Sequence, residues 1–331
     1  DYISYAIRTL LNIDILPEQA VIFAELWNRP FPMFIASRGW GKTFSMAVYC
    51  LLKMILTPSA AIGGAGCKIV IAGAAFRQSR FVFDYMEAIW NNSPKLRSLC
   101  RTNGRNPSGP FRETDKYTMK IGDNWAVAIP IGDGNKIRGL RANVVVADEF
   151  NSIPLSVFET VIQGFASVSA NPIANVKEYA KRKARQDLGM WTEDDQNIFD
   201  ERGKNQIILS GTAGYDFEHF AEYWRKYKSI IESKGDINIL RAIHGGELEE
   251  GFNWKDFSII RMPYELIPKG FMDEAQVARS KATFDAGTYA MEFASSFSKD
   301  SNGFFRRTLI ESCCVSDQTN FRTMPDGAEV F

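Results

Sequence analysis

A small, glycine-containing turn at residues 36–43 carries the side chains best suited to hold a phosphate. The apolar run Met33–Ile35 precedes this turn, and residues 44–55 after it are rich in helix formers. A turn between a strand and a helix can direct backbone N–H groups at phosphate oxygens, and the positive end of the helix attracts the same anion. Lys42 would reach the β- and γ-phosphates of a nucleotide, and the Thr43 hydroxyl would ligate Mg²⁺. The predicted nucleotide-binding residues of the turn are Ser37, Arg38, Gly39, Trp40, Gly41, Lys42 and Thr43.

This turn departs at one position from the usual P-loop pattern G-x-x-x-x-G-K-[ST]. Ala36 stands where the first glycine is expected. Alanine disfavours a positive φ, so we expect ordinary backbone angles at the start of the loop. The alternative interpretation is a chance Gly-Lys-Thr in a surface turn.

A second stretch, residues 143–150, places two adjacent carboxylates at the end of an apolar, β-branched run. Such a run indicates a buried central strand of a parallel sheet, and Asp148 and Glu149 follow it directly. Asp148 would hold Mg²⁺ through water, and Glu149 would polarise the attacking water. One carboxylate for the metal and the next for the nucleophile favour hydrolysis over transfer to a bound acceptor. A strand capped by two solvated acids is the alternative.

Composition sets few limits on function. The chain has 331 residues, of which 45% are hydrophobic and 24% charged, as in an ordinary soluble protein. Lys plus Arg and Asp plus Glu both total 39, so net charge gives no argument for or against nucleic acid. The five cysteines form no C-x-x-C pair and there are two histidines, which predicts neither a zinc site nor a disulfide framework and favours a reducing cytosolic setting.

The sequence predicts neither a membrane-spanning segment nor a targeting segment. Residues 46–56 are apolar but short and include Lys53, which indicates a buried helix and not a membrane span. We identify no signal peptide. Because the chain begins with Asp1, we expect it to be a fragment of a longer protein.

Residues 1–30 have a helical pattern that ends at Arg29-Pro30. Gln19 lies before the P-loop, where an amide could pair with both the N6 donor and the N7 acceptor of adenine. An exposed polar residue at a helix start is the other interpretation of Gln19.

Further along the chain, residues 68–73 resemble a second buried strand, and Arg77 and Gln78 follow in the next turn. These two side chains are either phosphate or DNA-backbone contacts or solvated loop residues. Residues 99–113 are polar with Gly and Pro, which predicts a loop. Residues 117–121 and 125–131 alternate around Gly122-Asp123-Asn124, which predicts a hairpin.

The glycine-flanked turn at residues 132–141 precedes the strand that ends in Asp148 and Glu149. The two arginines of this turn, Arg138 and Arg141, are candidates for charge stabilisation, and either is a candidate arginine finger that acts on a neighbouring subunit's nucleotide. An ion pair or a structural turn is the alternative role.

The second half of the chain contains one more strand-and-small-turn pattern. Residues 206–213 form it, and Ser210, Gly211 and Thr212 would sense hydrolysis, because a hydroxyl can change hydrogen-bond partner when phosphate leaves. We also predict helices at 153–167, 175–186, 217–228, 273–283 and 284–297, and strands at 237–243 and 258–262. The 175–186 helix is basic and could follow a phosphate backbone, although a solvated charged face is the favoured interpretation.

Taken together, these motifs resemble the large terminase subunit of tailed bacteriophages, the motor that packages DNA into the prohead. The resemblance spans most of the chain and depends on the order and spacing of five stretches. They are Gln19, the P-loop at 36–43, residues 136–150, residues 210–213, and residues 289–293 with 300–305.

The resemblance implies a pentameric ring that threads double-stranded DNA, with a portal protein and a small terminase subunit as partners, in the host cell cytoplasm. It implies that Arg38 stabilises the γ-phosphate in cis and Arg138 in trans, and it leaves open which of them acts. It also implies a nuclease domain, but only a short tail follows residue 310, so no nuclease residue is assigned. An isolated fragment of this kind could be monomeric.

We therefore predict an α/β fold: a three-layer P-loop NTPase of the additional-strand, catalytic-glutamate type, with a mainly parallel sheet. The ATPase domain would span residues 1–310, with a core at about 31–235, a lid or linker subdomain from about 1–30 and 240–310, and a tail at 311–331. ATP and Mg²⁺ are the predicted cofactors, with Glu149, Arg38 and Arg138 catalytic and Thr43 and Asp148 at the metal.

Three alternatives to a packaging ATPase stay open at this point. They are a helicase-like DNA translocase, a nucleotide-gated binding module without turnover, and a small-molecule P-loop kinase. No second motor domain is evident, and the intact Glu149 argues against a module without turnover. The Asp-Glu pair, together with an extra strand at 68–73 between the two motifs, disfavours the kinase.

Overall fold

The computed structural model describes residues 2–58, 66–131, 140–166, 172–190, 192, 205–248 and 252–299. The predicted finger Arg138 and the predicted tail at 311–331 lie outside the described residues. Among the residues that are described, no helix has the length and apolar character needed to cross a membrane.

Eight strands of the described residues form one sheet, in the order β3-β4-β5-β2-β6-β7-β1-β8. All neighbours pair in parallel except β3 with β4 and β4 with β5, which pair antiparallel. The strands are β1 (Phe31–Ala36), β2 (Lys68–Gly73), β3 (Gly109–Arg112), β4 (Tyr117–Ile121), β5 (Asn124–Pro130), β6 (Val144–Ala147), β7 (Gln206–Gly211) and β8 (Phe257–Met262). The predicted mainly parallel sheet and the predicted hairpin are confirmed.

One strand lies between the P-loop strand and the strand that ends in the two carboxylates, as the additional-strand class requires. That strand is β7, which pairs with β1 on one side and β6 on the other. Residues 68–73, the extra strand that lies between the two motifs along the chain, do not lie between them in the sheet. Those residues form β2, which lies on the other side of β6, because sequence order does not fix strand order in a doubly wound sheet.

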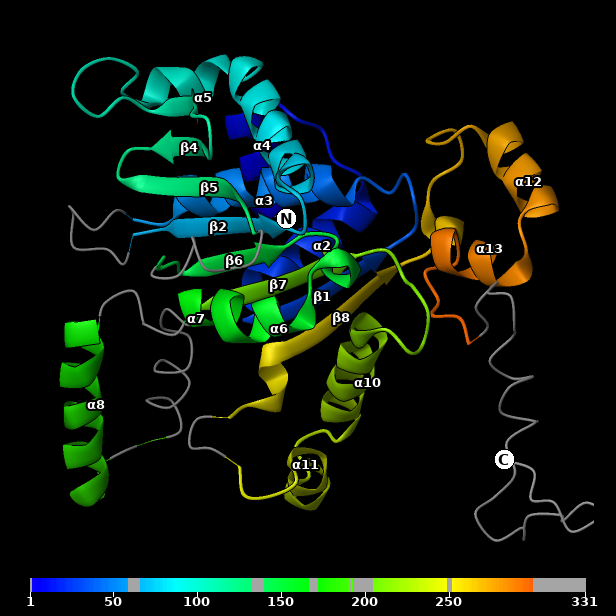
Figure 1. The fold of residues 1–331 in the computed structure, drawn as a ribbon. Coiled ribbons are helices and arrows are strands. Elements are labelled where there is room, and N and C mark those ends of the chain that lie inside the picture. The colour runs from blue at the N-terminus through cyan, green and yellow to red at the C-terminus, as the bar shows by residue number, and fades with distance from the viewer. Residues whose placement is uncertain are drawn as a thin grey trace, which may run out of the picture.

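Alternate residues of the central strands contribute to two separate hydrophobic cores, one on each face of the sheet. Phe34, Ile71 and Val146 belong to one apolar cluster, and Met33 and Val145 belong to the other. This alternation is expected of strands covered on both faces. Figure 1 shows the helices on either side, which makes the molecule a three-layer α/β structure.

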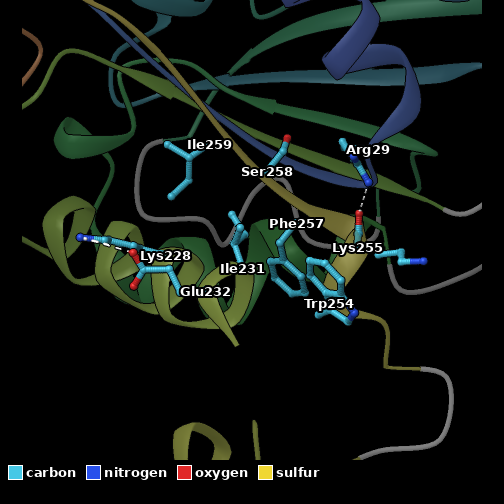
Figure 2. A pocket seen from close by; sticks show the side chains of 9 residues that line it. All are labelled: Arg29, Lys228, Ile231, Glu232, Trp254, Lys255, Phe257, Ser258 and Ile259. Carbon is cyan, nitrogen blue, oxygen red and sulfur yellow. Dashed lines mark hydrogen bonds and ion pairs between the residues drawn. The ribbon is translucent and has the colours of Figure 1, made fainter. Parts of the chain in front are cut away.

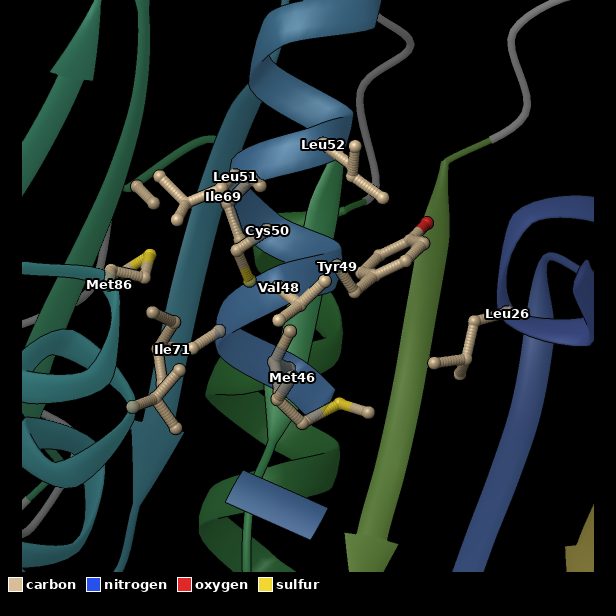
Figure 3. Close-up of a cluster of buried hydrophobic side chains, with 14 of the residues drawn as sticks. Leu26, Met46, Val48, Tyr49, Cys50, Leu51, Leu52, Ile69, Ile71 and Met86 are labelled. Carbon is tan, nitrogen blue, oxygen red and sulfur yellow. The ribbon is translucent and has the colours of Figure 1, made fainter. Parts of the chain in front are cut away.

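The face that contains Phe34 and Ile71 packs on the helix that follows the P-loop. Met46 and Tyr49 on this helix are fully buried against the sheet, as Figure 3 shows. The N-terminal helices contribute Ile7 to the same core. The helical elements of this face are α1 (Tyr2–Ala6), η1 (Ile7–Leu11), α2 (Pro17–Asn28), α3 (Lys42–Leu56), α4 (Phe76–Asn91) and α5 (Pro94–Leu99).

The opposite face is covered by short helical turns after β6 and by a longer helix after β7. Phe150 and Phe220 are fully buried there. The elements are η4 (Phe150–Ser152), α6 (Leu155–Val157), η5 (Phe158–Ile162), α7 (Gln163–Phe165) and α10 (His219–Glu232). The remaining elements are α8 (Pro172–Asp187), α11 (Ile237–His244), η6 (Trp254–Asp256), η7 (Tyr264–Leu266), α12 (Glu274–Thr283) and α13 (Ala286–Glu292).

Three of the predicted elements are corrected by the structure. Residues 237–244 form a helix and not a strand, because the Asp236 carboxylate accepts the amides of Asn238 and Ile239 and Gly245 ends the helix in a left-handed conformation. Within the predicted loop at 99–113, residues 109–112 form the edge strand β3. The predicted helix at 284–297 ends at Glu292, and Ser295 beyond it has a φ of 50°.

The predicted lid or linker segments have different positions in the fold. β8, which falls within 240–310, pairs with β1 as part of the main sheet, whereas α12 and α13 lie beside the sheet, beyond the end of β1 (Figure 1). The division into an ATPase core and a lid stays a prediction.

Candidate nucleotide-binding site

The P-loop connects the end of β1 to the start of α3, as its strand–turn–helix pattern predicts. Gly39 and Gly41 have φ values of 83° and 77°, a conformation that favours glycine. A Cβ on Gly39 would also lie 2.8 Å from the Met272 Cε atom. Ala36 belongs to β1 and pairs with Met262, and its φ is not positive. The loop therefore tolerates alanine at its first position because the left-handed turns come later.

Lys42 links the P-loop to the ends of two other strands. Its side chain is 9% exposed, and its Nζ donates to Thr212 Oγ1 at 2.9 Å and to the Ala36 carbonyl at 3.4 Å. The same Nζ lies 3.8 Å from Glu149 Oε1. Because these residues come from the carboxyl ends of β1, β6 and β7, the sheet brings together three motifs that are far apart in the sequence.

Asp148 is buried beneath this cluster, with one carboxylate oxygen available for a ligand. Its Oδ1 has no hydrogen-bond partner among the residues that the structure describes. Burial, and then the charge of Glu149, raise the pKa of Asp148 to about 6, while the charge of Lys42 lowers it. A buried carboxylate oxygen without a partner is a group that a cation would satisfy.

The other Mg²⁺ ligand that the sequence predicts is the Thr43 hydroxyl. Thr43 lies in the first turn of α3 and is partly exposed. Within the described ranges, no group of three or more His, Cys, Asp or Glu side chains gathers to hold a metal on its own. Mg²⁺ in phosphate-transfer sites commonly takes only one or two protein oxygens, with water and phosphate supplying the rest.

Glu149 has an unusual backbone conformation, with φ 49° and ψ 55°. A left-handed conformation at a residue other than glycine costs about 1–3 kcal/mol and is typical of functional sites. Hydrogen bonds on each side hold it: the Asp148 amide donates to the Ala72 carbonyl at 2.9 Å, and the Ser152 amide donates to the Glu149 carbonyl at 2.8 Å. The strained backbone presents Glu149 towards Lys42.

The predicted coupling residues lie at the end of β7, against the strand that carries the carboxylates. Ser210 is fully buried. A Cβ on Gly211 would lie 2.8 Å from Phe220 Cε1 and 3.5 Å from the Phe150 amide nitrogen, so a side chain there would collide. Thr212 follows and contacts Lys42. The three residues thus connect the P-loop with the turn after Glu149.

Arg38 and Gln19 do not take part in the Lys42 cluster. Arg38 is exposed, and its Nη1 lies 3.7 Å from Glu292 Oε2. Gln19 is buried, and its side-chain oxygen accepts the Leu16 amide at 2.9 Å. This bond satisfies a free amide at the start of α2, so Gln19 has a structural role, and its role at adenine stays a prediction. Gln78 does the same for α4 by accepting the Ala75 amide at 3.1 Å.

Two further residues shape the site without any signal in the sequence motifs. His219 Nε2 lies 2.9 Å from the Phe150 carbonyl oxygen and so donates a hydrogen bond to the turn after Glu149. Met272 fills the space beside Gly39. Both are distant in sequence from the motifs they contact, so only the fold identifies them.

A cavity of about 500 Å³ lies elsewhere, at the opposite end of the strands (Figure 2). Phe257 lines it and pairs with Phe31 at the start of β1. Of its cations, Arg29 donates to the Lys255 carbonyl at 2.6 Å, and Lys228 pairs with Glu232 at 3.7 Å. Ligands of open α/β sheets bind at the carboxyl ends of strands, which favours the Lys42 cluster as the nucleotide site.

Comparisons with known proteins bear on this fold. No family model and no curated protein matches the chain. Among solved structures, the large terminase of a thermophilic bacteriophage superposes with a TM-score of 0.53 at 10% identity, over 86% of this chain and 54% of that one. The fold of this chain is therefore similar to that of about half of a phage large terminase. The structure of that terminase in complex with ADP gives a TM-score of 0.53 at 9% identity, with the same coverage of 86% and 54%.

The terminase likeness concerns the fold, because the identities are low. The chain spans about half the length of these terminases. The expected α/β P-loop NTPase fold is thereby confirmed, and the roles of the individual site residues stay predictions.

Proposed function

We propose that the chain is the ATPase domain of a viral DNA-packaging terminase large subunit, which hydrolyses ATP to move double-stranded DNA into a prohead. The observation that carries this proposal is the contact of Lys42 with Thr212 and Glu149, which joins the P-loop, the coupling residues and the carboxylate pair at one edge of the sheet. The terminase fold and the ADP complex of a terminase with this fold support it.

The proposed mechanism begins with an exchange of partners at Lys42. Nucleotide phosphate would take the Lys42 ammonium from Glu149 and Thr212, because a phosphate carries more charge than a carboxylate. Glu149 would then be free to accept a proton from the attacking water. Thr43 and Asp148 would hold Mg²⁺, which would neutralise charge on the phosphates when bound. The loss of the contact between Lys42 and Thr212 would then be transmitted to β7, the strand that Thr212 follows.

Assembly would follow the same model. The packaging motor would be a pentameric ring around double-stranded DNA, with a portal protein and a small terminase subunit as partners, in the host cell cytoplasm. Arg138 would act on the nucleotide of a neighbouring subunit, and Arg38 would act on the nucleotide of its own subunit.

The test is steady-state ATP hydrolysis and binding of a fluorescent ATP analogue by the purified chain. Glu149→Gln is expected to reduce turnover by about 10²- to 10⁴-fold, because it removes the general base. It should bind the analogue at least as tightly as the parent, because the carboxylate that competes with phosphate for Lys42 is gone. Glu222→Gln is the matched control, since Glu222 forms an exposed ion pair with Lys226 on α10. Hydrolysis by Glu149→Gln near the parental rate contradicts the assignment.

The shared-site part of the proposal has its own readout. The rate per chain should climb with protein concentration, and Arg138→Ala should remove that climb. A rate per chain that does not change with protein concentration, together with no effect of Arg138→Ala on that rate, contradicts an arginine finger that acts in trans. Binding without turnover by the parent at every concentration, with or without DNA, would favour a nucleotide-gated binding module instead.

A further inference from the structure

Each of the two cations of the P-loop faces a carboxylate from another part of the chain. Lys42 Nζ lies 3.8 Å from Glu149, and Arg38 Nη1 lies 3.7 Å from Glu292 Oε2. The motifs assign roles to both members of the first pair. Glu292, the last residue of α13, belongs to the stretch 289–293 of the resemblance, but no role is assigned to it there.

The backbone around the Arg38–Glu292 pair is fixed by hydrogen bonds. The Arg38 amide donates to the Glu292 carbonyl at 2.8 Å, which satisfies one of the four free carbonyls at the end of α13. The Ser37 amide donates to the Met262 carbonyl at 2.9 Å, and the same carbonyl accepts the Ser295 hydroxyl at 3.1 Å. The P-loop, the end of β8 and the end of α13 are thus held together, and the two charged side chains remain the movable parts.

The side-chain pair itself is open to exchange. The Arg38 side chain is 76% exposed and that of Glu292 is 32% exposed, so solvent screens their attraction. A guanidinium binds phosphate through two parallel hydrogen bonds, and phosphate carries more charge than a carboxylate. A nucleotide phosphate in the P-loop would therefore compete with Glu292 for Arg38.

We infer that Glu292 is a positioning residue for Arg38. The Glu292 carboxylate competes with nucleotide phosphate for the Arg38 guanidinium and so weakens nucleotide binding. The inference rests on the proposed nucleotide site. It makes the end of α13 a determinant of how tightly the P-loop holds its nucleotide. It also predicts a sign that a merely structural residue would not give, because removal of the carboxylate should tighten binding.

The experiment is an equilibrium titration of fluorescent ADP with Mg²⁺ against the purified chain, Glu292→Gln, Arg38→Ala and the double variant. Glu292→Gln should bind about 2- to 5-fold more tightly than the parent, the size expected of one solvent-screened charge pair. In the Arg38→Ala background the same substitution should change the dissociation constant by less than about twofold. Glu222→Gln, which breaks an exposed ion pair on α10, should match the parent.

Two further measurements separate charge from structure. Glu292→Asp keeps the carboxylate and should stay within about twofold of the parent, and the gain of Glu292→Gln should shrink in high salt. Melting curves by circular dichroism identify any variant that fails to fold, in which case the comparison of Glu292→Asp with the parent carries the test. Unchanged or weaker binding by a folded Glu292→Gln, or a gain that persists without Arg38, overturns the inference. No binding by the parent overturns the nucleotide site itself.

Discussion

The two ends of the central strands treat their buried polar groups differently. At the amino end, Asn124 begins β5, accepts the Cys67 amide at 2.8 Å, and donates to the carbonyls of Met54 and Thr57 at 2.7 and 2.8 Å. At the carboxyl end, Asp148 Oδ1 and Ser37 Oγ are buried and have no partner in the described part of the chain. Since buried polar groups are nearly always hydrogen-bonded, the carboxyl end keeps bonds available for a ligand.

Gln206 extends the comparison along the amino end. It begins β7, and its Nε2 donates to the carbonyls of Leu26 and Arg29, both at 2.6 Å. The contrast is not complete, because the Ser258 hydroxyl on β8 also lacks a partner among the described residues. Polar groups at the amino ends of the strands therefore stabilise the fold, whereas those at the carboxyl ends are kept for a ligand at a cost in stability.

The largest expected effect comes from removing the charge at the carboxyl end. Asp148→Asn should lower ATP turnover by roughly 10³-fold, because a metal ligand is lost. It should also raise the melting temperature by a few degrees, because a buried charge is removed. Hydrolysis assays and calorimetry on one preparation measure both. A variant that loses activity and also melts lower would show that Asp148 stabilises the fold, as Asn124 does at the other end of the strands.

At the amino end, the effects of substitution should be reversed. Asn124→Ala removes three hydrogen bonds from a buried position and should lower the free energy of unfolding by about 3 kcal/mol. Nucleotide affinity of the folded fraction should stay within about twofold. Asp123→Ala, the exposed neighbour in the same turn, should change stability by less than about 0.5 kcal/mol. Denaturant titration and fluorescent ADP binding measure the two quantities.

A pH series sharpens the same contrast at Asp148. Its folded pKa of about 6 lies above the ordinary value of about 3.9, so the folded chain takes up the proton first as pH falls. Its contribution to stability therefore rises as pH falls from about 7 towards 4. The melting temperature of Asp148→Asn should exceed that of the parent by a few degrees at pH 7.5, and this gap should close by about pH 5.

Activity of the parent should move in the opposite direction. A protonated Asp148 cannot hold Mg²⁺, so the Mg²⁺ concentration that gives half-maximal turnover should rise as pH falls towards 6 and below. A melting gap that is constant with pH would mean that Asp148 is not the group that titrates.

The sequence predicted the elements whose signal is local. β1, β2, β6 and β7 are apolar runs bounded by small or acidic residues, and the Gly122-Asp123-Asn124 hairpin has its own turn signal. The convergence of Lys42 with Glu149 could be anticipated only because parallel strands end at a common edge. Arg138 stays a prediction, since it lies outside the described residues.

Other features depend on contacts that no local pattern records. Residues 237–244 are β-branched enough to resemble a strand, but Asp236 and Gly245 cap them as a helix. The left-handed Glu149 lies between two backbone hydrogen bonds, one from Asp148 to β2 and one from Ser152 in η4, and Glu292 meets Arg38 only because α13 ends beside the P-loop. Which strand separates β1 from β6 is likewise a property of the sheet and not of any one segment.

The smallest expected effect concerns the hydroxyl that links the two halves of the site. Thr212→Val removes the acceptor of the Lys42 bond with little change in shape. Because phosphate must take Lys42 from Thr212, the substitution should tighten fluorescent ADP binding by about 2- to 5-fold, and Thr212→Ser should stay at the parental value. If Thr212→Val does bind ADP more weakly, the hydroxyl contacts the nucleotide directly, and the carboxyl end would then hold a third ligand-binding group and not a released one.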